Sequence, residues 1–117
     1  MSENLKTDKE MIADGWIDCG LFYQKWVCWP KDKEGSTVTV EGLACVDDEP
    51  FLRIRLGREM NSRHEWRFQI DEKTENSNRS TLYFRRLTWD IGECQDDAIV
   101  GMEFELEKIL KERGLTL

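Results

Sequence analysis

The sequence predicts an α+β protein in which a curved antiparallel β-sheet of about five strands, arranged as a meander, packs against a C-terminal helix. Two observations support this prediction. Between residues 16 and 89, apolar and polar residues alternate with the two-residue period of strands, and short polar segments separate the runs. After residue 96, the apolar residues recur instead with the spacing of a helix.

The chain is long enough for a single domain with its own core, residues 1–117. Residues 1–14 are expected to form an arm or a short helix that Gly15 ends. Residues 16–89 should form the antiparallel sheet, and residues 96–113 should form the helix.

The first expected strand runs from Trp16 to Trp29 and is apolar on both faces, so it should be central or covered. Four further strands are expected at residues 36–46, 51–57, 64–70 and 81–89. Charged loops should connect them at 31–35 and 47–50, and the wholly polar segment 71–80 should be a hairpin tip.

The C-terminal helix is predicted by one apolar stripe, formed by Ile99, Met102, Leu106, Ile109 and Leu110. Asp96 or Asp97 is the expected N-cap, and Gly114 is the expected residue just after the helix. The competing interpretation is a strand over 100–106, where alternate residues are also apolar.

The net charge of -7 is unevenly distributed. Residues 1–50 carry a net charge of -6, residues 51–86 carry +4, and residues 87–117 carry -5. Eight of the nine arginines lie in the middle block, whereas seven of the eight lysines lie outside it. Because the planar guanidinium pairs with carboxylates and phosphates in a way that an ammonium does not, this segregation has chemical meaning.

Strict alternation places one polar row on the solvent face of the sheet, formed by Arg53, Arg55, Glu65, Arg67, Gln69, Tyr83 and Arg85. Trp66 and Trp89 fall in phase with the core instead. The row has two interpretations: ordinary solvated side chains with cross-strand pairs, or a recognition surface for an anion. In the second, the candidate binding residues are Arg53, Arg55, Arg67, Tyr83 and Arg85, with Tyr83 stacking on a nucleotide-like ligand.

Three tryptophans and two acidic clusters are further candidates for contact with a partner. Trp16, Trp26 and Trp29 cannot all share one face of a single strand, so they either cover a second surface or mark an interface, for which a homodimer is one possibility. The acidic clusters, which could equally be loop and helix-cap residues, are Asp47, Asp48, Glu49, Asp96 and Asp97.

We expect a non-catalytic acidic binding protein that associates stoichiometrically with a macromolecular partner. In charge and size alone it resembles the immunity proteins and phage-encoded inhibitors that occlude a basic surface, so a basic nucleic-acid-binding protein or enzyme is the expected protein partner. A sequence pI near 4.8 argues against direct binding of nucleic acid. The alternative function is a small anionic-ligand module on the arginine-rich sheet face.

Catalysis, metals and cofactors are not expected. The four cysteines and the single histidine lack the short spacing of a zinc site, and no phosphate-binding or catalytic motif is present. Cys94 with His64 is the nucleophile pair that the sequence allows, but Glu93, Asp96 and Asp97 would raise the pKa of that thiol. With no export signal and no apolar run of membrane-spanning length, the expected location is cytoplasmic.

Overall fold

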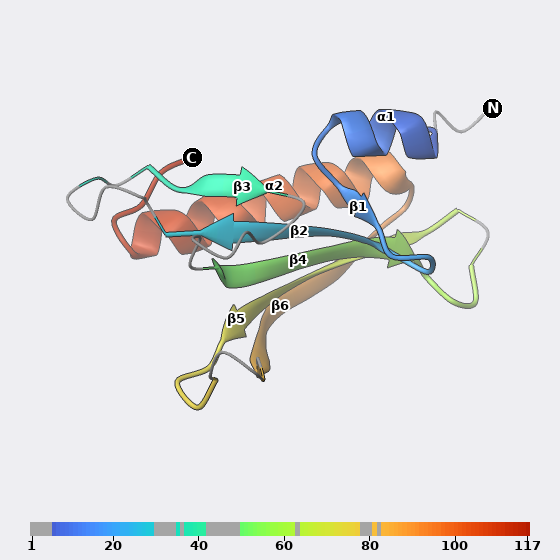
Figure 1. Cartoon of the computed structure of the whole chain (residues 1–117). Coiled ribbons are helices and arrows are strands. Elements are labelled where there is room, and N and C mark those ends of the chain that lie inside the picture. The colour runs from blue at the N-terminus through green and yellow to red at the C-terminus, as the bar shows by residue number, and fades with distance from the viewer. Residues whose placement is uncertain are drawn as a thin grey trace.

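The computed structural model describes residues 6–29, 35, 37–41, 50–62, 64–77, 81 and 83–117 of the chain. Its elements, in chain order, are α1 (Asp8–Ala13), β1 (Ile17–Asp18), β2 (Tyr23–Cys28), β3 (Thr39–Glu41), β4 (Pro50–Arg58), β5 (Trp66–Lys73), β6 (Phe84–Gly92) and α2 (Gln95–Glu112) (Figure 1). The predicted α+β class is confirmed, because an open antiparallel sheet of six strands packs against α2 and the short helix α1.

The strand order is β1-β2-β4-β5-β6, and all these pairings are antiparallel. The strand expected at residues 36–46 is represented by β3, which pairs with β2 on the edge that β1 also uses. β2 therefore lies directly beside β4, and β3 stays outside the run from β2 to β6. Residues 42–49, which contain the end of that expected strand, and residues 31–34 of the first expected loop lie outside the described residues.

The single strand expected from Trp16 to Trp29 is wrong, because β1 and β2 form a hairpin there. Gly20, with a φ of 92°, lies in the connection, where its backbone conformation is one that residues with a Cβ rarely adopt. The turn passes close to Gly57 of β4, where a Cβ would lie 3.1 Å from the Leu21 carbonyl oxygen and 3.2 Å from the Phe22 Cβ. Gly57 thus allows Leu21 and Phe22 to lie against β4.

The short N-terminal helix α1 begins with a capping box. The Thr7 hydroxyl accepts a hydrogen bond from the Glu10 N–H, and the Glu10 carboxylate accepts one from the Thr7 N–H. This reciprocal pairing satisfies two backbone donors at the start of the helix, which explains why so short a helix forms here.

The C-terminal helix α2 is confirmed, and the competing strand over 100–106 is wrong. Its N-cap is Cys94, so the predicted N-caps Asp96 and Asp97 lie in the first turn instead, where their charge still suits the helix dipole. Gly114 follows the helix with a φ of 71°, as predicted for a residue in the left-handed conformation.

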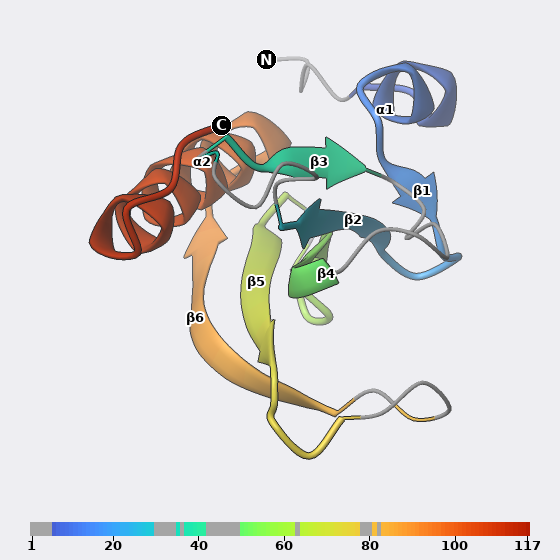
Figure 2. The same cartoon turned by 60° about the vertical axis from the view of Figure 1, so that its left-hand side comes forward.

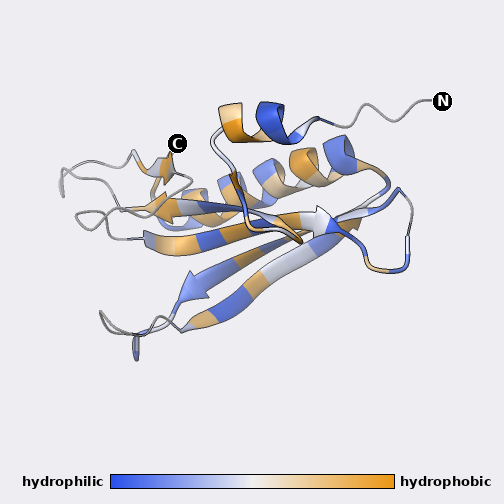
Figure 3. Cartoon of the chain, turned by 45° about the vertical axis from the view of Figure 1, so that its right-hand side comes forward, coloured by the Kyte–Doolittle hydropathy of each residue, from blue (hydrophilic) through white to orange (hydrophobic). Residues whose placement is uncertain are grey.

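The hydrophobic core lies between one face of the sheet and the two helices. Alternate residues of β4 and β5 enter it, including Leu52, Ile54 and Phe68, and α2 contributes the stripe Met102, Leu106 and Leu110. The alternation of hydrophobic and hydrophilic residues along these strands is visible in Figure 3. Within the described residues, no helix has both the length and the apolar character needed to cross a membrane.

The sheet curls toward the face that does not carry the core. Trp26 on β2 and Phe84 on β6 have ring centroids 5.5 Å apart, although β4 and β5 lie between their strands. In a flat sheet, β2 and β6 would be about 14 Å apart. The hairpin of β5 and β6 correspondingly bends away from α2 in Figure 2. This curl makes the non-core face concave at the Phe84 end.

Candidate anion-binding face

The concave side of the sheet carries Arg53 and Arg55 on β4 and Arg67 on β5, as the alternation predicted. These side chains are half-buried rather than fully solvated. We define the arginine face by its charged and amide residues and by four aromatic residues that contact them or one another, namely Arg53, Arg55, Arg67, Gln69, Asp71, Arg86, Phe22, Trp26, Phe84 and Trp89.

Asp71 is the buried anion of the arginine face and is 1% exposed. Its carboxylate accepts hydrogen bonds from Arg53 Nε and Nη2, at 3.2 and 3.0 Å, and from Arg55 Nη2 at 3.0 Å. Gln69 Nε2 donates to its other oxygen at 2.7 Å. Asp71 is not among the residues expected on this face, because it begins the polar segment 71–80 that the sequence predicts as a hairpin tip. Its phase with Arg67 and Gln69 was the signal that could have found it.

Guanidinium groups lie over aromatic rings along the whole face. The guanidinium carbon of Arg53 is 4.1 Å from the centroid of Phe84, and that of Arg67 is 4.5 Å from Trp89. Arg86 approaches the same Trp89 ring at 5.8 Å. Such contacts hold a planar cation close to a ring and restrict its motion, so these arginine side chains are partly fixed in position.

The predicted placement of Arg85 on this face is wrong. Ile70 pairs with Thr88 and Asp71 pairs with Arg86, so a β-bulge leaves Leu87 without an opposite residue and reverses the alternation before it. Arg85 therefore lies opposite Glu72, whose carboxylate it contacts at 2.6 Å, and Arg86 takes the place on the arginine face.

Trp89 and Tyr83 also differ from the expectation. Trp89 was expected in the core but is 44% exposed and pairs in register with Gln69 on the arginine face, whereas Trp66 is buried as expected.

Tyr83 precedes β6 and is 49% exposed. Its carbonyl oxygen accepts a hydrogen bond from the Thr74 N–H at 2.8 Å, which closes the hairpin. Its stacking role stays a prediction.

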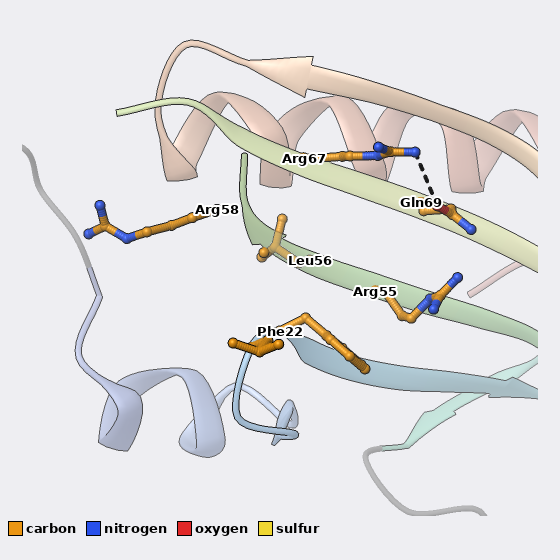
Figure 4. Close-up of a pocket in the computed structure, with 8 residues that line it drawn as sticks. Phe22, Arg55, Leu56, Arg58, Arg67 and Gln69 are labelled. Atoms are coloured by element: carbon orange, nitrogen blue, oxygen red, sulfur yellow. Dashed lines mark hydrogen bonds between the residues drawn. The ribbon is translucent and has the colours of Figure 1, made fainter. Parts of the chain in front are cut away.

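A shallow cavity of about 260 Å³ opens on the arginine face, and we call it the arginine cavity. Within the part of the chain that the structure describes, its lining contains three arginines and no carboxylate, and consists of Leu21, Phe22, Arg55, Leu56, Gly57, Arg58, Arg67 and Gln69. Figure 4 shows Arg67 extending along β5 toward Gln69 with Arg55 on the neighbouring strand, whereas the Arg58 side chain extends the other way. Arg67 donates to the Gln69 side-chain oxygen at 3.4 Å and has no carboxylate partner among the described residues.

A second cavity of about 640 Å³ adjoins the first and shares Leu21, Phe22, Gly57 and Arg58 with it. Its remaining lining includes three carboxylates and two further aromatic rings, and consists of Asp8, Asp18, Gly20, Tyr23, Glu59, Met60, Ser62 and Trp66. We call it the acidic cavity. Sequence patterns could not have found either cavity, since both depend on the crossing of the β1–β2 turn over Gly57.

Two of the acidic residues of this cavity already have partners. The Tyr23 hydroxyl donates to Asp8, and burial, followed by this hydrogen bond, raises the pKa of Tyr23 to about 12. The phenol therefore stays protonated at neutral pH. Asp18 accepts a hydrogen bond from the Gly20 N–H at 2.8 Å. Glu59 differs, because its Oε2 is buried without a hydrogen-bond partner among the described residues.

The three candidate interface tryptophans do not form one surface. Trp16 is buried in the core, with the Lys25 ammonium 4.5 Å from its ring centroid. Trp26 lies on the arginine face, and Trp29, at 41% exposure, stacks on Phe51 with centroids 4.1 Å apart.

The acidic candidates separate into two groups. Asp47, Asp48 and Glu49 lie outside the described residues. Asp96 and Asp97 are exposed on α2, next to a helix face on which Val100 and Phe104 are 65% and 67% exposed.

The three described cysteines lie in different surroundings. Cys28 is buried, Cys19 is exposed and Cys94 is half-buried at the start of α2. His64 is exposed in the loop before β5, and neither it nor Cys94 lines the two cavities. Within the described ranges, no three histidine, cysteine or acidic side chains are grouped as metal ligands would be.

No family model matches the chain, and no curated protein and no solved structure is similar enough to count as a match. The class that the fold and the site define is therefore a small α+β protein with a concave, arginine-rich sheet face.

Proposed function

We propose that this chain is a non-catalytic binding protein that holds an anionic group of its ligand in the arginine cavity. The observation that supports this most directly is the composition of the lining, which among the described residues has three arginines and no carboxylate in a chain of net charge -7. A guanidinium that is held in place and lacks a carboxylate partner is suited to a carboxylate or phosphate, which it can bind through two parallel hydrogen bonds.

Arg67 is the central residue of this proposal. It is held over Trp89 and has only the long hydrogen bond to Gln69 among the described residues, so its donors are available to a ligand. Arg55 differs, because one of its nitrogens is already bound to Asp71. A ligand anion would thus replace no ion pair between Arg67 and another described residue.

The test is calorimetric titration at pH 7 with inorganic phosphate, pyrophosphate and glutarate. Arg67→Gln should weaken the binding of the tightest of these anions by about 10- to 100-fold, since a hydrogen bond to a charged group contributes about 1.5–3 kcal/mol. The matched control is Arg86→Gln, because Arg86 lies over the same Trp89 ring but does not line the cavity. Equal effects of the two substitutions, or no binding of any anion by the wild-type protein, would refute the proposal.

A second candidate function is docking of a basic protein on α2. The first three turns of the helix expose two large apolar residues, Val100 and Phe104, with exposed acids around them, namely Asp96, Asp97, Glu103 and Glu107. An apolar centre with a charged surround is the usual composition of an interface that associates rapidly with a partner of opposite charge. This arrangement would suit an inhibitor or immunity-type protein.

The second function is tested by affinity capture from the native host with elution by salt, using three baits. The wild-type protein and Met60→Ser, which alters an equally exposed apolar residue elsewhere, should retain the same basic protein. Phe104→Ser should lose it. Retention by all three baits would contradict a role of this helix face.

A further inference from the structure

The arginine cavity and the acidic cavity are parts of one surface, because four residues line both. Gly57 is one of them, and its missing side chain leaves room between the Leu21–Phe22 turn and β4. On one side of this boundary lie Arg55 and Arg67, and on the other lie three carboxylates. A ligand that crosses the boundary therefore meets positive charge at one end and predominantly negative charge at the other.

Unpaired buried atoms are concentrated in these same two linings. Four buried side-chain polar atoms lack a hydrogen-bond partner among the described residues, and three of them, Arg55 Nε, Glu59 Oε2 and Trp66 Nε1, belong to residues of the two cavities. Buried polar atoms in folded proteins are nearly always paired, because an unpaired one loses its hydration without gaining a hydrogen bond. Arg55 Nε is an unpaired donor of an arginine-cavity residue. In the acidic cavity, Trp66 Nε1 belongs to a lining residue and is a donor, and Glu59 Oε2 is an acceptor.

The unpaired carboxylate oxygen indicates which group the acidic cavity prefers. Asp8 and Asp18 have hydrogen-bond donors within the protein, but Glu59 Oε2 has none among the described residues. The terminal torsion of a glutamate is broad, so its carboxylate can turn toward the cavity at low cost. A cationic nitrogen satisfies such a carboxylate, because a hydrogen bond between two charged groups is stronger than one between neutral groups.

We propose that the two cavities together bind an amino-acid unit with an acidic side chain, that is, an α-ammonium a few bonds away from a side-chain carboxylate or phosphate. The anionic side chain lies in the arginine cavity with Arg67 and Gln69, and the ammonium lies in the acidic cavity with Glu59. This inference rests on the function proposed above and specifies the chemistry of its ligand. Either a free acidic amino acid or the amino-terminal residue of a peptide supplies these groups.

The size and rim of the acidic cavity favour the peptide as the source. Its volume of about 640 Å³ exceeds what an ammonium and one α-carbon need. Leu21 and Met60, both 92% exposed, lie at its lining and offer apolar contact to residues that follow the first one. We therefore expect a tripeptide that begins with glutamate to bind more tightly than free glutamate.

The test is calorimetric titration of the wild-type protein with four probes, namely L-glutamate, glutarate, the tripeptide Glu-Ala-Leu and its N-acetylated form. Glutarate differs from glutamate by lacking the ammonium, and acetylation removes the positive charge of the amino terminus of the tripeptide. Glutamate or the free tripeptide should bind about tenfold or more tightly than the counterpart that lacks the ammonium, which is the factor that one hydrogen bond to a charged group contributes. Tighter binding of the tripeptide identifies a peptide as the source, and tighter binding of glutamate identifies the free amino acid.

Glu59→Gln should abolish the preference for the ammonium, whereas Glu65→Gln, a matched change at an exposed residue outside both cavities, should preserve it. The wild-type ratios decide the question even if Glu59→Gln does not fold. Equal binding of glutamate and glutarate, and of the two tripeptides, overturns this inference and leaves anion binding at Arg67 intact. If no anion binds, or if Arg67→Gln changes nothing, the proposed function fails and this inference fails with it.

Discussion

Replacing the buried carboxylate of the arginine face by an amide tests how much this ionic cluster stabilises the fold. In Asp71→Asn, Arg53 and Arg55 lose the charge that each approaches at 3.0 Å. Breaking a buried ion pair by removing one partner costs about 3–5 kcal/mol. Here the arginine side chains retain 22% and 32% exposure and regain some hydration, so we expect a loss of about 2–3 kcal/mol. A domain of ordinary stability would stay folded after such a loss.

The assay is urea unfolding followed by tryptophan fluorescence, with the free energy of unfolding obtained by linear extrapolation. Asp90→Asn is the matched control, since Asp90 is exposed on β6 and its Oδ1 accepts from the Ile91 N–H at 2.7 Å, a bond that asparagine retains. The control should stay within about 0.5 kcal/mol of the wild type. If Asp71→Asn also lowers the free energy of unfolding by less than about 0.5 kcal/mol, the stabilising role of the cluster is refuted.

Asp71→Asn should also affect ligand binding: it destabilises the fold but should strengthen the binding of an anion. The substitution releases the Arg55 nitrogen that Asp71 holds and raises the net charge of the arginine face by one. Phosphate or glutarate should therefore bind several-fold more tightly in the titration described above. Weaker anion binding by a folded Asp71→Asn protein would show instead that Asp71 positions Arg55 for the ligand.

Two further substitutions have outcomes that the structure defines. Gly92→Ala should destabilise the fold by about 2 kcal/mol or more in thermal unfolding, because the new Cβ would lie 2.4 Å from the Ala98 backbone nitrogen and neither backbone can yield easily; an unchanged melting temperature would contradict this contact. Glu72→Gln should cost about 1 kcal/mol at pH 7, since its carboxylate contacts Arg85 and Arg113 at 2.6 Å. Burial opposes the ionisation of Glu72, but these two hydrogen bonds outweigh it and lower its pKa below 4.5. The difference in the free energy of unfolding between the variant and the wild type should therefore shrink as the pH falls through that lowered pKa. A difference that persists in acid would contradict this account.

Alternation along the sequence was sufficient to place Arg53, Arg55 and Arg67 on one face, because β4 and β5 pair regularly over seven consecutive residues of each strand. It failed at Arg85, since a bulge changes phase without leaving a local pattern that differs from ordinary alternation. The α+β fold class and the C-terminal helix were predictable from the periodicity of the apolar residues and from composition.

The features that shape the candidate site were not predictable in this way. The crossing of the β1–β2 turn over Gly57 joins residues more than thirty positions apart, and Phe22 reaches the arginine cavity only through it. The contact between Trp26 and Phe84 likewise depends on how far four strands curl. Local sequence carries no signal for the partner of such a contact, so these placements require tertiary structure.

The unmatched Leu87 of β6 gives the register of this strand a role separate from its composition. If β6 paired with β5 without the bulge, Leu87 would lie opposite Asp71 and Arg86 opposite Glu72, and Arg85 would move to the concave side of the sheet. One extra residue therefore decides which of two adjacent arginines lies beside Asp71, without altering the total charge. The register of β6, and not its composition alone, sets the electrostatic character of the concave side.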